Sequence, residues 1–255
     1  MPAVTPKLTV RRLPKRAENL SRYNRPMASS LVASPVEIRC KGILFDMDGI
    51  LVSSLGSVDR CWTIWANMRG VDPAYALSIT HGCRAIETLK KLRPDLDSQA
   101  ELKIIEDLEI EDSGDVRVLP GVLSLLLSLP AERWTVVTSA TERLARVRLA
   151  AGGITPPARF ITAEKVTNGK PHPEPFLAGA ALLGLHPEEC VVFEDSASGA
   201  KAGRAAGCTV VATTFSHSVG DLAAAHYLVS DLTGVAATAL PGDQGLLLRV
   251  TPLAE

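Results

Sequence analysis

Short apolar segments recur along the chain from about residue 40 onward. They are rich in β-branched residues and span 42–45, 134–137, 159–162, 191–193 and 209–212, with a weaker one at 227–229. Short continuous apolar runs are typical of strands that are buried on both faces of a parallel sheet. The pattern therefore predicts about six buried strands.

Segments with helical spacing separate these runs. They span 122–129, 142–151, 174–183 and 197–206, and Gly207 follows the last one as a C-terminal cap would. Regular alternation of strand and helix favours parallel strands joined by right-handed crossovers. We therefore predict an α/β fold with a doubly wound parallel sheet.

One block interrupts the alternation after the first strand. Residues 53–117 contain no convincing strand run, but 55–69, 83–92 and 98–110 have helical spacing. We predict a small helical cap domain at 55–117, inserted into a core domain formed by 37–54 and 118–255. An insert at this point would lie over the carboxyl ends of the strands.

The first 36 residues differ from the rest in charge and pattern. They hold seven of the 27 Lys and Arg residues but one of the 28 acidic residues, five prolines and little periodicity. We predict a disordered basic tail at 1–36. A transit segment, a nucleic-acid-binding arm and a true start at Met27 remain open alternatives.

Composition narrows the class of protein. Apolar residues make up 46% and charged residues 22%, which is enough for a packed core, and the net charge of −1 gives no support to nucleic acid as a partner. No apolar run approaches the length of a membrane span. Five widely spaced cysteines without a CxxC pair argue against a disulfide scaffold or zinc knuckle, and favour a cytoplasmic setting.

Polar residues gather where the predicted strands end. Four strand ends or following loops supply Asp46 and Asp48, then Ser139, then Lys170, then Glu194 and Asp195. In an open α/β sheet these ends face one crevice, where ligands bind. Close carboxylates repel each other, and Mg²⁺ relieves the repulsion by binding carboxylate oxygens together with a substrate phosphate. Lys170 and Ser139 suit the remaining phosphate oxygens.

Four motifs in this order resemble those of the haloacid dehalogenase superfamily. They are Asp46-Met47-Asp48-Gly49-Ile50-Leu51, Thr138-Ser139-Ala140, Lys170-Pro171 and Glu194-Asp195-Ser196. The resemblance covers about residues 40–235. The helical insert is similar to the cap of the beta-phosphoglucomutase-like branch. His81-Gly82-Cys83-Arg84 and the segment 170–175 are similar to sugar- and polyol-phosphate phosphatases.

The resemblance implies a Mg²⁺-dependent phosphatase that acts on a small phosphorylated metabolite. Asp46 would be the nucleophile that forms an aspartyl-phosphate, and Asp48 the general acid and base. Asp46, the Asp48 backbone carbonyl and Asp195 would hold the metal, with Glu194 close by. The phosphate would be bound by Ser139, Ala140 and Lys170, and Arg84 is the candidate for a substrate contact from the cap.

Two other functions remain open. A phosphomutase of the same branch would keep all four motifs, although Val58 stands where that branch carries a histidine. A non-catalytic protein that binds a phosphorylated ligand is the second alternative, although such a protein should have lost a motif residue. Hexose, pentose, deoxysugar and glycerol phosphates and phosphoglycolate are all candidate substrates, and the oligomeric state is not predicted.

Overall fold

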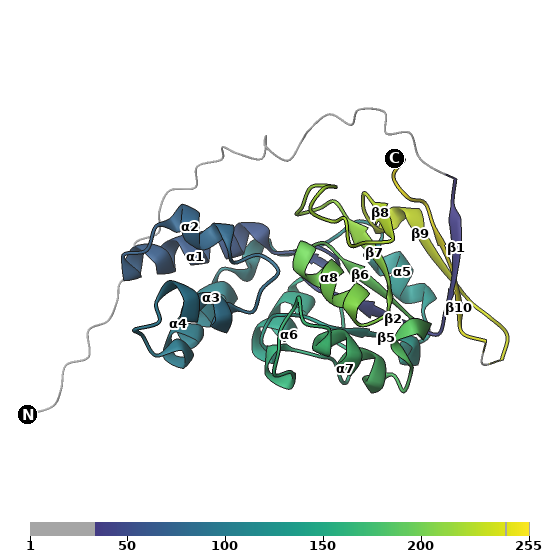
Figure 1. Cartoon of the computed structure of the whole chain (residues 1–255), viewed down its shortest axis with the longest axis horizontal. Coiled ribbons are helices and arrows are strands. Elements are labelled where there is room, and N and C mark those ends of the chain that lie inside the picture. Colours follow the sequence, from purple (N-terminus) through teal and green to yellow (C-terminus); the bar gives the residue numbers. More distant parts are fainter. Residues whose placement is uncertain (1–33, 243, 255) are drawn as a thin grey trace, which may run out of the picture. The chain divides into compact units, whose positions relative to one another are not determined.

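The main sheet has five parallel strands. The computed structural model describes residues 34–242 and 244–254, so most of the predicted tail, including Met27, lies outside the described residues. The strand order is β5 (Trp134–Val136), β2 (Gly42–Phe45), β6 (Cys190–Glu194), β7 (Thr209–Thr213) and β8 (Tyr227–Val229) (Figure 1). This is the doubly wound α/β sheet that the alternation of strands and helices predicts.

Helices pack on both faces of this sheet. Ile43 and Phe45 of β2 belong to the core cluster beneath α5 (Val122–Ser128) and α6 (Glu142–Ala151). Leu44 points to the opposite face and belongs to the cluster beneath α7 (Glu174–Leu182) and α8 (Ala197–Ala205). Successive side chains of a strand point to opposite faces, so an uninterrupted apolar run is required when both faces are covered.

A second, antiparallel sheet was not predicted. Its strand order is β1 (Val36–Cys40), β10 (Leu246–Val250) and β9 (Val235–Ala239). Val36, the last residue of the predicted tail, is the first residue of β1 and pairs with Val250. The predicted strand at 159–162 is wrong, because only a single bridge between Val137 and Ile161 forms there.

Four helices follow the first strands of the chain: α1 (Leu55–Arg69), α2 (Pro73–Ser78), α3 (Ala85–Leu92) and α4 (Ser98–Glu111). We call Leu55–Glu111 the four-helix segment. It has a core cluster of its own, which includes Trp62, Trp65, Leu89 and Ile105. The short strands β3 (Val52–Ser53) and β4 (Arg117–Val118) pair antiparallel at its two connections. The cap domain boundaries at 55–117 stay a prediction.

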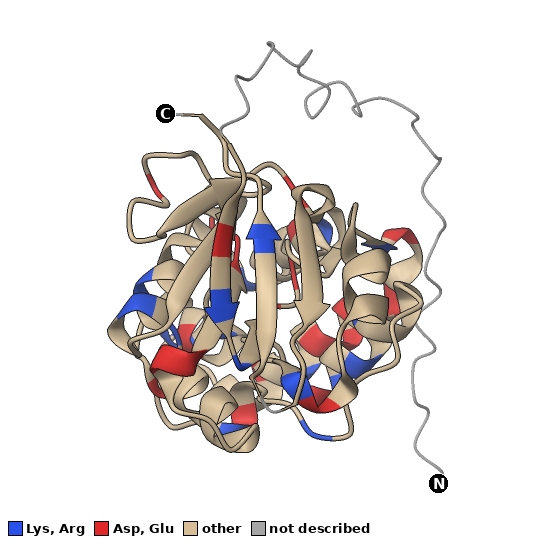
Figure 2. Ribbon diagram, turned by 90° about the vertical axis from the view of Figure 1, so that its right-hand side faces the viewer, with Lys and Arg blue, Asp and Glu red and all other residues tan. Residues whose placement is uncertain are grey.

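Among the described residues, single 3₁₀ turns also occur at Ser113–Asp115, Ala131–Arg133, Ala163–Lys165, Pro187–Glu189 and Leu232–Gly234. Within the described ranges, no helix has both the length and the apolar character needed to cross a bilayer. All five cysteines are free thiols. Acidic and basic positions alternate along the ribbon in Figure 2.

Candidate active site

The site lies where β2 and β6 end side by side. Asp46 follows β2 directly, and its backbone N–H donates to the carbonyl oxygen of Phe193 in β6. Glu194 ends β6, and Asp195 follows it. Because the two parallel strands are hydrogen-bonded neighbours, their first residues beyond the sheet point into one crevice.

Lys170 joins two of these carboxylates. Its Nζ lies 2.6 Å from Oδ1 of Asp46, 2.7 Å from Oε1 of Glu194 and 3.1 Å from the carbonyl oxygen of Val137. The side chain is buried, which lowers its pKa, but the charges of Asp46 and Glu194 outweigh burial and raise the pKa above its ordinary value. Lys170 is therefore an ammonium ion.

Glu194 is held on both oxygens. Oε1 accepts the hydrogen bond from Lys170, while Oε2 accepts from the backbone N–H of Asp195 and from both the N–H and the hydroxyl of Ser196. A Cβ on Gly199 would lie 1.7 Å from Oε1. The first turn of α8 thus needs glycine there to make room for this carboxylate.

The carboxylates of Asp46, Glu194 and Asp195 together form a site that fits a divalent cation. Ligand oxygens of Asp46, Glu194 and Asp195 lie within 4.8 Å of one another. Burial raises the pKa of Asp46 to about 7, although the charge of Lys170 lowers it. Burial and the charge of Glu194 raise the pKa of Asp195 well above its ordinary range. One ammonium for three buried carboxylates leaves an excess of negative charge, which a divalent cation would neutralise.

The loop after Asp46 passes very close to Asp195. Gly49 has φ = +81°, and a Cβ built on it would lie 1.8 Å from Oδ2 of Asp195. Ser216 also donates a short hydrogen bond to the same carboxylate oxygen. The position of Asp195 therefore depends on a residue without a side chain at 49.

Asp48 lines the same cavity as Asp46, but its carboxylate binds other partners. Oδ1 accepts a hydrogen bond of 2.6 Å from the Ser54 hydroxyl, and Oδ2 accepts one of 2.9 Å from Nη1 of Arg148. Arg148 lies in α6 and was not predicted as a site residue. It stands in a helix without a motif around it, so nothing local in the sequence could have revealed it.

Ser139 and Ala140 line the same cavity as Asp46 and Lys170. They follow β5, the neighbour of β2, as the strand pattern requires. The N–H of Ala140 donates to the Thr138 hydroxyl at 3.1 Å. Their binding of phosphate stays a prediction.

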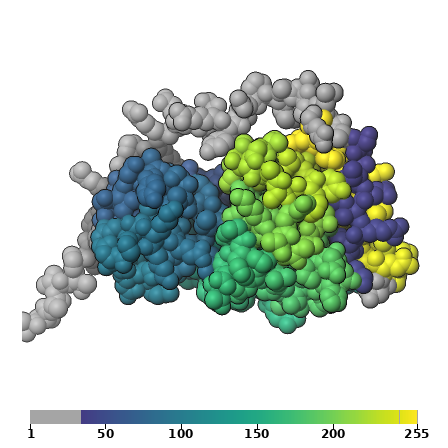
Figure 3. All heavy atoms as spheres, viewed as in Figure 1, coloured from purple at the N-terminus to yellow at the C-terminus, as the bar shows by residue number. Residues whose placement is uncertain are grey.

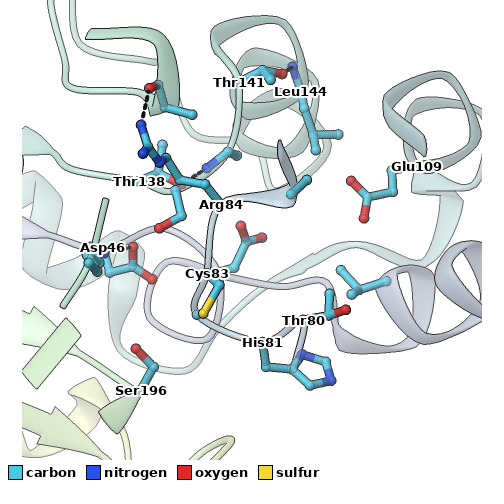
Figure 4. A pocket seen from close by; sticks show the side chains of 18 of the residues that line it. Asp46, Thr80, His81, Cys83, Arg84, Glu109, Thr138, Thr141, Leu144 and Ser196 are labelled. Carbon is cyan, nitrogen blue, oxygen red and sulfur yellow. Dashed lines mark hydrogen bonds and ion pairs between the residues drawn. The ribbon is translucent and has the colours of Figure 1, made fainter. Parts of the chain in front are cut away.

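Arg84 makes contacts that were not predicted. It precedes α3 and lines the cavity (Figure 4). Its guanidinium donates to the Glu87 carboxylate and to the carbonyl oxygens of Ala163, Val166 and Thr167. The arginine therefore fastens the four-helix segment to the loop after residue 162. Its contact with substrate stays a prediction.

The cavity over these residues is lined from two sides. The core supplies the polar groups described above, and the four-helix segment supplies apolar side chains such as Val58, Trp62 and Ile105. In Figure 3 the blue residues of the four-helix segment meet the green residues of the core. A phosphate ester bound at Asp46 would have its alcohol part between the two.

Comparison with known proteins supplies the family. The family model described as haloacid dehalogenase-like hydrolase matches residues 43–213. Hexitol phosphatase A of Escherichia coli (strain K12) is 43% identical over 180 residues, which cover 69% of this chain and 83% of that protein. Glycerol-1-phosphate phosphohydrolase 2 of Saccharomyces cerevisiae is 33% identical, covering 72% and 80%.

Comparison with solved structures identifies the same fold. The crystal structure of beta-phosphoglucomutase from Clostridium difficile superposes with a TM-score of 0.64 at 23% identity, covering 76% of this chain and 92% of that one. The predicted fold class is confirmed, and so is the predicted enzyme class of phosphatase. With its four motifs meeting at the ends of β2, β5 and β6, the chain belongs to the haloacid dehalogenase-like hydrolase family.

Proposed function

We propose that the protein is a Mg²⁺-dependent phosphatase that hydrolyses phosphate monoesters of small sugars or polyols through an aspartyl-phosphate on Asp46. One observation carries the proposal. The Asp46 carboxylate lies beside the Lys170 ammonium and within 4.8 Å of Glu194 and Asp195. A nucleophile for phosphorus, a cation for phosphoryl oxygens and a set of metal ligands thus meet at one point.

Two aspartates carry out the proposed reaction, Asp46 as nucleophile and Asp48 as acid and base. A carboxylate oxygen of Asp46 attacks phosphorus in line, and the bond from phosphorus to the leaving alkoxide breaks. Asp48 gives that alkoxide a proton. Asp48 then takes a proton from the water that attacks the aspartyl-phosphate, which releases inorganic phosphate and restores Asp46. Lys170, Ser139 and Ala140 would bind the phosphoryl oxygens.

The metal would be held by the Asp46 and Asp195 carboxylates and the backbone carbonyl of Asp48. Bound Mg²⁺ would supply charge neutralisation for the phosphoryl oxygens. Both oxygens of Glu194 already accept hydrogen bonds, from Lys170 and from residues 195 and 196. We therefore assign Glu194 the task of holding Lys170 and the turn that carries Asp195.

The proposed substrates follow from the relatives. Their names specify a hexitol phosphatase and a glycerol-1-phosphate phosphohydrolase, so we propose a polyol or sugar phosphate here. Val58 lines the cavity where the mutase branch carries a histidine, which supports hydrolysis over transfer within a bisphosphate. The five free thiols suit a cytoplasmic location.

Phosphate release from a panel of sugar and polyol phosphates, with and without Mg²⁺, tests the proposal. We expect Mg²⁺-dependent release that falls by at least ~10³-fold in Asp46→Asn. Asp97→Asn, at the start of α4, is the control and should keep wild-type rates. Release that survives in Asp46→Asn would overturn Asp46 as nucleophile. A folded, Mg²⁺-bound protein that releases no phosphate from any ester would overturn the phosphatase.

A further inference from the structure

A buried guanidinium connects the general acid to the four-helix segment. Nη1 of Arg148 lies 2.9 Å from Oδ2 of Asp48, and Nη2 lies 3.4 Å from Oε2 of Glu109 in α4. The side chains of Arg148 and Glu109 are 5% and 6% exposed. Both line the cavity that contains Asp46. The Arg148–Glu109 pair therefore forms part of the wall beside the proton donor.

Two of the donor groups of Arg148 lack an acceptor. Nε and Nη2 are buried and have no hydrogen-bond partner among residues 34–242 and 244–254. Leaving a buried donor unpaired costs about 1–3 kcal/mol, and more when the group is charged. Such groups are rare in folded proteins unless water or a ligand satisfies them. An acceptor that belongs to neither side chain is therefore expected at this guanidinium.

Glu109 offers the complementary group. In Figure 4 its carboxylate points into the cavity from α4. Burial raises the pKa of Glu109, while the positive charge of Arg148 lowers it. The contact of 3.4 Å is longer than an ordinary N–H···O hydrogen bond, so it leaves Nη2 of Arg148 without a close acceptor, while the Glu109 carboxylate also has a hydrogen bond with Trp62. A group that both donates and accepts a hydrogen bond would complete the pair.

We propose that Arg148 and Glu109 form a subsite for a hydroxyl group on the carbon next to the phosphoester carbon of the substrate. The inference rests on the proposed function and specifies its substrate class. Asp48 protonates the ester oxygen, and the guanidinium reaches from Asp48 to Glu109. A hydroxyl one carbon further along the substrate accepts from Nη2 of Arg148 and donates to Glu109.

The charges of this wall select against a second anion. Arg148 is already shared by two carboxylates, Asp48 and Glu109. Arg84 is bound to Glu87 and to backbone carbonyls, so it does not neutralise another negative group there. A carboxylate or second phosphate at this place would meet the negative charge of Glu109, and the nearest cation, Arg148, already faces two carboxylates. The subsite therefore suits neutral polyol esters and excludes phosphoglycolate and bisphosphates.

Two esters that differ in one hydroxyl test the subsite. Glycerol 1-phosphate has a hydroxyl on the middle carbon, whereas propane-1,3-diol monophosphate lacks it and is otherwise the same. We expect wild-type kcat/KM to favour glycerol 1-phosphate by at least ~10-fold, the effect of one hydrogen bond to a charged group. In Glu109→Leu this ratio should fall close to one. Glu109→Gln, which keeps the shape, should lower it less.

Glu101→Gln is the matched control, because Glu101 is a buried carboxylate of the same helix that binds Trp65 and Arg69. The ratio of kcat/KM for the two esters in Glu101→Gln should equal that of the wild type. Equal rates for the two esters in the wild type, an unchanged ratio in both Glu109 variants, or a wild-type preference for phosphoglycolate would overturn the inference alone. Absence of phosphate release from any ester by Mg²⁺-loaded wild type would overturn the proposed function and this inference together.

Discussion

Lys170 lies within hydrogen-bonding distance of Asp46, with its Nζ 2.6 Å from Oδ1 of that carboxylate. The lysine comes from a loop 124 residues away and is buried together with its partner. The same ammonium binds Glu194 at 2.7 Å. One side chain thus holds the Asp46 carboxylate in place and offsets part of the negative charge of the buried carboxylates.

Lys170→Met should reduce both activity and stability. Without the ammonium, the phosphoryl oxygens lose a charged partner, and we expect kcat to fall by about 10²–10³-fold. Two buried carboxylates lose their cation, so the free energy of unfolding of the metal-free protein should fall by about 3–5 kcal/mol. Steady-state kinetics and urea unfolding measure the two effects. Lys165→Met, a half-exposed lysine outside the cavity, should change neither by much. Full activity in Lys170→Met would contradict this role.

The stability of the metal-free protein should depend on the ionisation of Asp46. Its pKa is about 7 in the folded protein and near 3.8 in the unfolded chain. The protonated Asp46 carboxyl stabilises the folded state fully below about pH 4. This stabilisation is lost as the pH rises through about 7, because the buried carboxyl must then give up its proton. Relative to Asp46→Asn, wild type in EDTA should lose roughly 1–4 kcal/mol over this range.

Thermal unfolding of wild type and Asp46→Asn at several pH values measures this difference. Adding Mg²⁺ should remove the loss in the wild type, because the metal binds the ionised carboxylate. The same metal should do little for the variant. A difference between the two proteins that does not change between pH 4 and pH 7 would be inconsistent with a raised pKa of Asp46.

Gly49→Ala should damage the metal site without touching a catalytic side chain. The new methyl group would overlap Oδ2 of Asp195, and φ = +81° is unfavourable for alanine. We expect Mg²⁺ affinity, measured by calorimetry, to fall at least ~10-fold, with a similar loss of kcat/KM at limiting Mg²⁺. Gly70 also has a positive φ, but no atom lies within 4 Å of the Cβ that alanine would add. Gly70→Ala therefore controls for backbone strain. Equal Mg²⁺ affinity in the two variants would refute the steric argument.

Arg84→Ala should loosen the attachment of the four-helix segment to the core. Three carbonyl oxygens between residues 163 and 167 would lose their donor. Amide hydrogen exchange in this loop and in α3 should become faster even without substrate. Arg93→Ala, at the other end of α3, contacts Asp95 and Arg69 and should leave the loop unchanged. Unchanged exchange together with a raised KM would instead support a contact with substrate.

The parallel sheet and its helices were predictable because each carries a local pattern. The helix predicted at 55–69 is α1, and the runs at 42–45 and 209–212 lie in β2 and β7. Helix α2 was missed because it has six residues, too few to show a period, although Asp72-Pro73 is a recognisable start. The run at 159–162 has the composition of a strand, but only Ile161 pairs.

Tertiary pairing explains what local patterns could not predict. Strands β1 and β10 each alternate between buried and exposed positions, yet nothing in either segment indicates the other as its partner. In the site, Asp46, Lys170, Glu194 and Asp195 were predicted from motifs, and the structure places them together. Arg148 was missed because its partners, Asp48 and Glu109, are distant in sequence and its helix has an ordinary composition.

The antiparallel sheet also bears on how the chain folds. The main sheet uses segments up to Val229, but β1 is an edge strand that pairs only with β10 among the described strands. During synthesis, β1 is made early and stays without its partner until residue 250 has emerged. Unpaired edges invite intermolecular association, and contacts between distant segments form slowly. Charged side chains on an edge strand oppose such association, and Glu37 and Arg39 place opposite charges on the exposed face of β1.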